Sequence, residues 1–196
     1  MNVGTTEFPM SYTCTPEIQR VSDFLVVVGC AECVWDDISS VSFNGKDVLV
    51  LSDMGMFFPG TITHWASCHP NIIVGGKLVR DQRRYHEDFL SHIPDYAAPK
   101  IGDVTWTIPK LAGTSGMFGT LIGIGLGYTK IILAGIPLNR SGHFWNPKIK
   151  VKFDKSGIRL SWQQISQKIF NNKVRSLSGW TRELLGSPTE EWLNVK

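Results

Sequence analysis

The sequence predicts an α/β protein built on a mainly parallel β-sheet. Two continuous apolar runs, FLVVVG at 24–29 and DVLVLSD at 47–53, are separated by a stretch with helical periodicity. A third run, IILAG at 131–135, follows a second helical stretch. Strands that are apolar on both faces are covered by helices on both sides, which is typical of parallel sheets. The order of strand, helix and strand therefore predicts parallel neighbours joined by right-handed crossovers.

The composition is that of an ordinary globular protein. The chain has 196 residues, of which 42% are hydrophobic and 19% are charged. This length suits one domain, and the composition excludes disordered and low-complexity chains. We predict a single domain over 1–196, with a core at about 22–138 and a C-terminal part at 139–196.

The first predicted unit of the core is a strand, a helix and a second strand. The strand at 24–29 ends at a glycine, and the next stretch places Val34, Trp35 and Ile38 on one helical face. The second strand follows at 48–52. We expect the two strands to be parallel neighbours, because a covering helix joins them.

The next part of the chain is harder to interpret. Residues 54–61 contain too many turn formers for a helix, so we expect a loop there, followed by a third strand at 62–67. The polar and aromatic segment at 76–100 predicts one short helix and a surface crossing. It is the best candidate for a mobile flap.

The segment 113–138 gives the clearest pattern. A helix over 113–127 has small residues at Gly119, Gly123 and Gly127, and a buried strand follows at 131–136. Glycine in a helix interior costs about 1 kcal/mol relative to alanine. So many glycines therefore indicate that this helix lies close against the sheet.

The C-terminal part changes pattern. After 139, the stretch HFWNPKIKVKFDKSGIRLSW at 143–162 predicts a β-hairpin closed at Lys155-Ser156-Gly157, and 161–174 predict a helix. A last helical segment has Thr181 as its cap and Gly186 as its stop. Together these elements predict a Rossmann-like three-layer sandwich with a mainly parallel central sheet, plus a C-terminal β-hairpin and helices.

The charge pattern gives little reason to expect nucleic acid as a partner. The formal net charge is +3, and the main basic run consists of alternating lysines at 148–155. Affinity for nucleic acid grows with the number of phosphates that a protein neutralises. Alternating lysines suit a solvated edge strand. The charge pattern is still compatible with a small anionic ligand.

We do not expect a membrane partner. No apolar stretch is long enough to cross a bilayer, and MNVGTTEFPM at 1–10 lacks an apolar run of signal-peptide length. These features predict a cytoplasmic location.

The cysteines do not make a strong case for a metal. Cys30 and Cys33 form a lone CxxC, which is compatible with a redox pair or half of a zinc site. The second CxxC or the histidine pair that would complete a zinc site is missing. Free cysteines are commonly buried, so we expect no metal here.

In an open parallel sheet, ligands bind outside the carboxyl ends of the strands. Four loops qualify, and they follow the strands at 24–29, 48–52, 62–67 and 131–136, the last of them running from Pro137 to Trp145. The turn of Gly113, Thr114, Ser115 and Gly116 joins them, because it opens the helix at 113–127. Free N–H groups at a helix start can bind a phosphate or carboxylate. The same residue types also cap helices for structural reasons. The turn is neither a Walker A loop nor a GxGxxG fingerprint.

Three polar residues are candidates for proton transfer or ligand binding. Asp53 directly follows a buried strand, where a carboxylate can hold ribose hydroxyls or a metal, accept a proton, or cap the next turn. His69 lies just past the third strand, and His143 lies in a glycine-bounded loop where it is accessible for proton transfer. His64 lies within the third strand, so we interpret it as structural.

Other side chains are candidates for ligand contact. Aromatic residues crowd the loops, and one or two could stack on a base or sugar, although most such residues are core; Trp65 is the candidate that we retain. Arg175 and Arg182 could neutralise a phosphate if the C-terminal segment folds over the pocket. They could equally pair with the glutamates of that segment at the surface.

Four blocks together resemble known proteins over most of the chain. They are VVVGCAECVWDD, LVLSDMGMFFPGTITHWASCHP, GTSGMFGTLIGIGLGYTKIILAGIPL with HFW after it, and VRSLSGWTRELLG. They resemble a family of small phage and bacterial proteins. More distantly, the arrangement is similar to the single-domain Rossmann-like bacterial sialyltransferases, and to flagellin-modification and pterin pyrophosphokinase-like proteins.

The sialyltransferase resemblance implies a nucleotide site. Thr114, Ser115 and Gly116 would contact a cytidine nucleotide, and Gly29 and Cys30 would line its site. The chain departs from these relatives at two places. It has GCAEC at 29–33 where they usually have GNGPS, and it has Ser52 where they commonly have asparagine. The relatives also have a catalytic histidine after the last core strand, for which His143 is the nearest candidate.

These observations lead to one main hypothesis and two alternatives. The main one is a nucleotide-binding, glycosyltransferase-like transferase that uses a nucleotide-linked donor, with His143 or Asp53 as base. Beyond this nucleotide or nucleotide-sugar donor, no cofactor is implied. One alternative is a non-catalytic phage accessory or virion-associated module on the same scaffold. The other is a nucleotide or nucleotide-sugar hydrolase.

Overall fold

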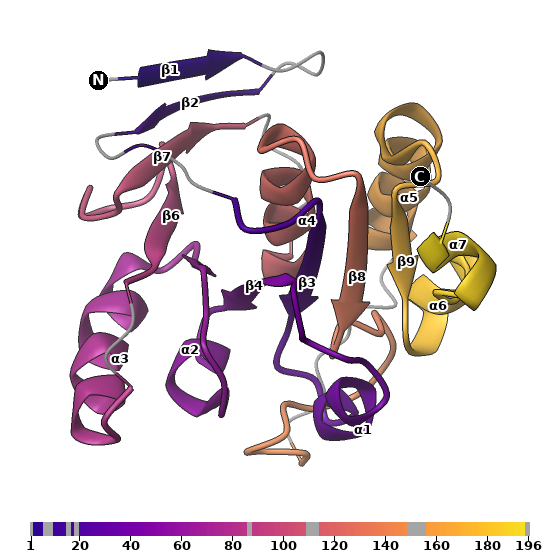
Figure 1. The fold of residues 1–196 in the computed structure, drawn as a ribbon, viewed down its shortest axis with the longest axis horizontal. Coiled ribbons are helices and arrows are strands. Elements are labelled where there is room, and N and C mark those ends of the chain that lie inside the picture. The colour runs from indigo at the N-terminus through magenta and orange to yellow at the C-terminus, as the bar shows by residue number, and fades with distance from the viewer. Residues whose placement is uncertain are drawn as a thin grey trace.

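The computed structural model describes residues 2–5, 10–14, 17, 20–85, 88–108, 114–148 and 156–194 of the chain. Within these residues, nine strands form one sheet in the order β1-β2-β7-β6-β5-β4-β3-β8-β9 (Figure 1). The strands are β1 (Asn2–Thr5), β2 (Ser11–Cys14), β3 (Phe24–Val28), β4 (Asp47–Leu51), β5 (His64–Ala66), β6 (Leu90–Pro94), β7 (Val104–Thr107), β8 (Lys130–Ala134) and β9 (Val174–Ser176).

The sheet is parallel from β7 to β9, and β1 and β2 add an antiparallel pair at one edge. The central strand β3 pairs with β4 on one side and with β8 on the other, so that Val26 lies opposite both Val48 and Ile132. From β3 the chain builds outward through β4, β5, β6 and β7, and then returns to add β8 on the far side of β3. This reversal makes the β3–β8 boundary the topological switch point, where such sheets bind ligands.

Helices cover both faces of the sheet, which confirms the predicted three-layer α/β fold. They are α1 (Val34–Ser39), α2 (Met54–Phe57), α3 (Pro70–Gln82), α4 (Ser115–Gly125), α5 (Ser156–Ile165), the π-helix η1 (Ser166–Phe170), α6 (Gly179–Leu185) and α7 (Glu190–Asn194). Side chains of β3 alternate between two apolar clusters. Leu25 and Val27 belong to the cluster that contains α4, and Val26 and Val28 belong to the cluster that contains Val34 of α1.

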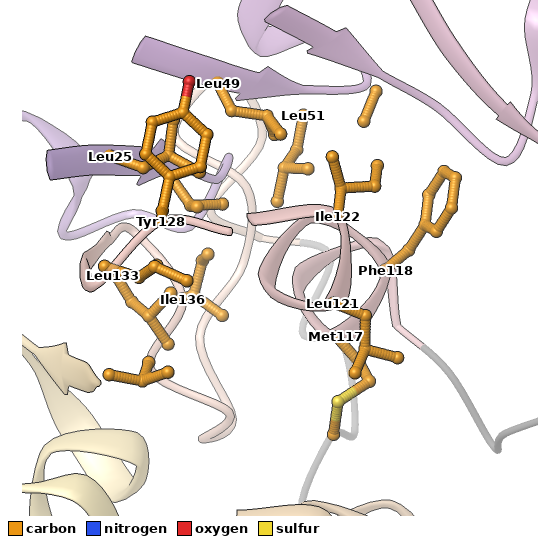
Figure 2. Packing of buried hydrophobic residues seen from close by; sticks show 14 of the residues in the cluster. Leu25, Leu49, Leu51, Met117, Phe118, Leu121, Ile122, Tyr128, Leu133 and Ile136 are labelled. Atoms are coloured by element: carbon orange, nitrogen blue, oxygen red, sulfur yellow. The ribbon is translucent and has the colours of Figure 1, made fainter. Parts of the chain in front are cut away.

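The helix α4 lies close against the sheet, as its glycines predicted. A Cβ atom at Gly119 would lie 2.6 Å from a methyl carbon of Leu51, and one at Gly123 would lie 2.8 Å from a methyl carbon of Ile131. Figure 2 shows side chains of α4 packed with those of the neighbouring strands in this cluster. Larger residues at the two glycines would push α4, and the turn that begins it, away from the sheet.

The predicted core strands correspond to β3, β4, β5 and β8, but two predictions for the intervening chain were wrong. Residues 54–57 form the short helix α2 rather than a loop. The expected surface crossing within 76–100 contains the buried strand β6. The polar Ser91 made this stretch look like a surface segment in the sequence. In the structure the Ser91 hydroxyl donates to Asp103 Oδ2 at 2.6 Å, which allows it to be buried in the strand.

The C-terminal prediction also needs correction. Ser156 begins helix α5, so Ser156-Gly157 does not close a hairpin, while 149–155 lie outside the described residues. Thr181 is not the cap of the last predicted helix, since α6 already begins at Gly179. The sheet extends beyond the predicted core of 22–138, because β1, β2 and β9 all join it.

A hydrogen-bonded chain of buried side chains crosses the sheet beneath α4. The indole N–H of Trp106 donates to His92 Nδ1 at 3.0 Å, which leaves His92 Nε2 to donate to His64 Nδ1 at 3.0 Å. His64 Nε2 then donates to the Tyr128 hydroxyl at 2.9 Å, and that hydroxyl donates to Asp47 Oδ2 at 2.9 Å. We call these five residues the buried relay. His64 is therefore structural, as its position in the strand predicted.

Burial keeps both histidines of the relay neutral. Desolvation lowers the pKa of His64 to about 4, although the charge of Asp47 opposes the shift. The pKa of His92 is lowered well below its usual value, first by burial and then by its neighbour His64. A neutral imidazole has one donor and one acceptor nitrogen, so the single direction of the relay assigns both tautomers.

Candidate functional site

A cavity of about 450 Å³ lies at the carboxyl ends of the central strands. Its wall brings together loops that are far apart in the sequence, and it surrounds the switch point between β3 and β8. The predicted site residues in this wall are Gly29, Cys30, Ser52, Asp53, His69, Thr114, Ser115, Gly116 and His143. Gly113, the remaining residue of the predicted turn, lies outside the described part of the chain.

The first turn of α4 contributes free backbone donors to this cavity. Thr114 is the N-cap, and its Oγ1 accepts from the N–H of Met117 at 3.3 Å. The N–H of Phe118 donates to the Thr114 carbonyl oxygen at 3.2 Å. Among the described residues, the N–H groups of Ser115 and Gly116 have no acceptor, and both residues line the cavity. Thr114 thus caps the helix and still leaves two amides for an anionic ligand.

Ser52 joins the end of β4 to the start of α4. Its Oγ donates to Ser115 Oγ at 3.3 Å. The Ser52 backbone has a φ of 47°, a left-handed conformation that is uncommon outside glycine and asparagine. Two contacts hold it there, because its N–H donates to the Ala66 carbonyl oxygen at 2.9 Å and its own carbonyl accepts from Trp65 Nε1 at 2.8 Å. The strained turn therefore places the hydroxyl beside the α4 start.

Glycines bring the loops after β3 and β8 into close contact. A Cβ atom at Gly29 would lie 2.5 Å from the carbonyl oxygen of Gly135, so a side chain is excluded there. Gly135 has a φ of +66°, and its N–H donates to Asp37 Oδ2 at 2.7 Å. Asp37 also accepts from the Ser178 hydroxyl at 2.7 Å. This buried carboxylate thereby ties α1, the end of β8 and the chain after β9 together behind the cavity.

The cysteines near the cavity are protonated thiols. Cys30 Sγ donates to the Leu51 carbonyl oxygen at 3.3 Å, and burial raises its pKa to about 12. Burial also raises the pKa of Cys33 to about 11, and its sulfur lies 3.2 Å from Ser178 Oγ rather than on Cys30. Desolvation likewise raises the pKa of Cys68 in the cavity wall. In the part of the chain that the structure describes, no cluster of three or more His, Cys, Asp or Glu side chains could hold a metal ion.

The candidate acid–base residues differ in their surroundings. Asp53 precedes α2, but its side chain makes no capping hydrogen bond. His69 is exposed before α3, whereas the half-buried His143 pairs with Ala31 as an isolated β-bridge. The imidazoles of His69 and His143 make no hydrogen bond to another described residue, unlike those of the buried relay. Both rings are therefore available to a ligand.

Three predicted ligand contacts do not line the cavity. Trp65 is fully buried, and its indole supports Ser52 from behind the cavity. Arg175 lies on β9, where its guanidinium donates to Asn172 Oδ1 at 2.8 Å and packs over Trp192. Arg182 is exposed on α6 and donates weakly to the Leu177 carbonyl oxygen at 3.4 Å. Neither arginine lines the cavity, because the C-terminal segment packs beside β9 rather than over the pocket.

The apolar part of the wall extends from the end of β8 into the loop from Pro137 to Trp145, which the sequence placed at this edge of the sheet. Ile136, Pro137 and Leu138 follow β8 and line the cavity, and Leu138 has a φ of 47°. The Thr181 hydroxyl donates to the Ile136 carbonyl oxygen at 2.6 Å and fixes this turn. Ile136 was not expected in the wall, because the sequence assigns it to the end of the strand at 131–136.

Comparison with known proteins identifies relatives by structure only. No protein-family model matches the chain, and no curated protein matches it in sequence.

The helices in the part of the chain that the structure describes are all too short or too polar to span a membrane.

Solved structures of sialyltransferases share the fold. The monofunctional alpha-2,3-sialyltransferase Cst-I from Campylobacter jejuni is 12% identical, with a TM-score of 0.62 over 94% of this chain and 86% of that one. The sialyltransferase CST-II in complex with a trisaccharide acceptor and CMP is 14% identical, with a TM-score of 0.61 over 88% of each chain. CstII from Campylobacter jejuni with cytidine-5'-monophosphate is also 14% identical, with a TM-score of 0.58 over 88% of each chain. The chain thus has the fold of bacterial sialyltransferases.

Proposed function

We propose that this protein is a glycosyltransferase that uses a cytidine-nucleotide-linked sugar as donor. The observation that carries the proposal is the convergence of the free α4 amides with the ends of β3 and β4 in one cavity. Ser115 and Gly116 offer two N–H donors, and the α4 dipole favours negative charge at the same place. A phosphate of the donor fits this chemistry.

The structural neighbours support the choice of nucleotide. Two of them were solved with CMP or cytidine-5'-monophosphate, and one of these also holds a trisaccharide acceptor. The cavity of about 450 Å³ is within the range of small-molecule sites. At 12–14% identity the neighbours share the fold with this chain, so its own cavity residues have to carry the chemistry.

In the proposed reaction, the acceptor hydroxyl attacks the anomeric carbon of the donor sugar. The bond between that carbon and the donor phosphate oxygen breaks, and its electron pair leaves with the nucleotide. His143 takes the proton of the acceptor hydroxyl, with Asp53 as the other candidate base. His143 suits this role because the residue lines the cavity and its imidazole makes no hydrogen bond to another described residue.

The direct test is isothermal titration with CMP, CMP-linked sugars and UDP-linked sugars. We expect CMP and its sugar conjugates to bind, and Ser115→Trp to abolish binding by filling the space beside the α4 amides. Ser187→Trp is the matched control, because Ser187 is exposed after α6 and does not line the cavity. Absence of binding to every nucleotide would contradict the proposal.

Product analysis separates the proposal from its two alternatives. Transfer of the sugar to a saccharide acceptor supports the transferase. Release of free sugar in an amount that added acceptor does not reduce indicates a hydrolase, in which water is the attacking group. An empty cavity together with stable association with a virion or other large assembly indicates a non-catalytic module. The altered loop GCAEC at 29–33 is the sequence feature that favours this last alternative.

A further inference from the structure

The ring of His143 stacks on the ring of Trp145. Their centroids are 4.6 Å apart and their planes differ by 2°. The His143 imidazole forms no hydrogen bond with any other residue that the structure describes. In many enzymes a carboxylate or carbonyl group orients the catalytic imidazole through a hydrogen bond. Here the aromatic contact takes the place of that bond.

Trp145 is itself fixed by other aromatic rings. It stacks on Phe57 of α2, with centroids 6.0 Å apart and planes 16° from parallel. Phe144 meets it edge-on at 4.8 Å and also meets Phe57 edge-on at 5.3 Å. Arg83, at the end of α3, covers the Phe57 ring and donates to the Met56 carbonyl oxygen at 2.9 Å. The indole therefore has a defined orientation although it is 40% exposed.

The backbone places the His143 Cα atom but leaves the ring free to rotate. The N–H of Phe144 donates to the Cys30 carbonyl oxygen at 3.0 Å, and the N–H of Glu32 donates to the Gly142 carbonyl oxygen at 3.0 Å. These bonds tie the segment to the loop after β3. They do not involve the imidazole, whose ring contact in the described structure is the stack on Trp145.

We infer that Trp145 is a positioning residue, which holds the imidazole of His143 at the cavity through ring stacking. This inference rests on the proposed function, in which His143 accepts the proton of the acceptor hydroxyl. The stack contributes orientation, because a base must lie within hydrogen-bond reach of that proton. It also contributes electrostatic stabilisation, because the electron-rich indole face favours the imidazolium that forms when the proton arrives.

The test compares Trp145→Leu, which removes the aromatic face, with Trp145→Phe, which retains one. Selective histidine labelling and NMR report the χ1 rotamer of His143 through three-bond couplings, with the resonances assigned by His143→Gln. We expect a single rotamer in the parent and in Trp145→Phe, and averaging over rotamers in Trp145→Leu. Trp35→Leu is the matched control, because Trp35 is 39% exposed and contacts Phe144 edge-on but does not stack on His143.

The kinetic arm measures CMP release from a CMP-linked sugar in the presence of a saccharide acceptor. We expect Trp145→Leu to lower kcat about tenfold, since a displaced base loses its alignment with the reacting groups. CMP affinity should stay within about twofold of the parent, because the α4 amides are untouched. Trp145→Phe should restore most of kcat, and Trp35→Leu should not lower it.

Two results would overturn the inference. One is an unchanged single rotamer of His143 in Trp145→Leu, which would show that the imidazole does not depend on the indole. The other is rotamer averaging with full kcat, which would show that the orientation does not matter for turnover. If no variant or parent turns over any donor, the proposed function fails, whereas the NMR comparison still decides whether Trp145 holds His143.

Discussion

Two pairs of histidines in this molecule have opposite environments. His64 and His92 lie in the buried relay, where both nitrogens of each ring have partners. His69 and His143 lie in the cavity wall, where neither imidazole has a hydrogen-bond partner among the described residues. Both rings of the relay are buried and neither residue lines the cavity, so neither ring can reach a ligand there. The comparison teaches that the histidines with shifted pKa values stabilise the fold, whereas the proposed function uses a histidine whose ring nitrogens are free for a ligand.

The largest effect that would separate the two pairs is loss of turnover at the cavity. We expect His143→Gln to reduce kcat by about 10²- to 10⁴-fold, because general base catalysis contributes that much. Its free energy of unfolding should fall by about 1 kcal/mol or less, because the imidazole makes no hydrogen bond to a described residue and loses only its stack on Trp145. Steady-state kinetics and urea unfolding measure the two quantities. A strongly destabilised variant would show that His143 is structural after all.

The relay should show the reverse behaviour. We expect Asp47→Ala to lower the free energy of unfolding by about 3 kcal/mol, because it leaves the Tyr128 hydroxyl and the N–H groups of Val21 and Ser22 without their buried acceptor. Asp23→Ala is the control, since the Asp23 side chain is 69% exposed and lies 3.8 Å from Arg20. Equal losses in the two variants, measured by urea unfolding, would contradict the account of the relay.

Acid should destabilise the fold through the relay. Burial lowers the pKa of His64 to about 4 in the folded state from its ordinary value of 6.5, so the unfolded chain binds more protons between these two values. The contribution of His64 to the free energy of unfolding, about 3 kcal/mol, is therefore fully present above about pH 6.5 and is lost as the pH falls toward 4. Thermal unfolding from pH 7.5 to 4.5 measures this trend. His64→Gln should flatten it, and an unchanged pH dependence in that variant would assign the trend to other groups.

The smallest effect concerns the strained turn between the two regions. Trp65 neighbours His64 in β5, and its indole holds Ser52 in the left-handed conformation at the cavity. Glycine adopts this conformation freely, so Ser52→Gly should stabilise the protein by about 0.5 kcal/mol or leave it unchanged. CMP binding should weaken modestly, because the contact of Ser52 Oγ with Ser115 is lost. Tighter CMP binding in this variant would remove Ser52 from the candidate site.

The central strands and the cavity loops could be predicted from the sequence because their signals are local. FLVVVG and KIILAG are apolar runs that end at glycine, and a turn of Gly, Thr and Ser opens α4. The carboxyl-end rule then places their loops together without any knowledge of distant contacts. This is why Ser115, Ser52 and Gly29 were expected in one place, and the cavity contains all three.

The missed features depend on partners that are distant in the sequence. The polar residues of β6, LSHIP, look like a surface segment until Ser91 finds Asp103 and His92 finds Trp106. Trp65 looked like a ligand contact because it lies near the cavity loops in the sequence, but the alternation of β5 turns it into the core. No local pattern indicates such pairings, because in the sequence each partner is only a single residue with nothing nearby to mark the residue that it will contact.

The buried relay limits which replacements its members can accept. An indole can only donate and a carboxylate can only accept, so with Trp106 at one end and Asp47 at the other the relay cannot reverse its direction. Each interior position must hold a group that gives one proton and receives another, which restricts it to an imidazole, an amide or a hydroxyl of matching length. We expect tolerated substitutions at His64 and His92 to come from this short set, and an apolar residue at one position to require a compensating change at the next.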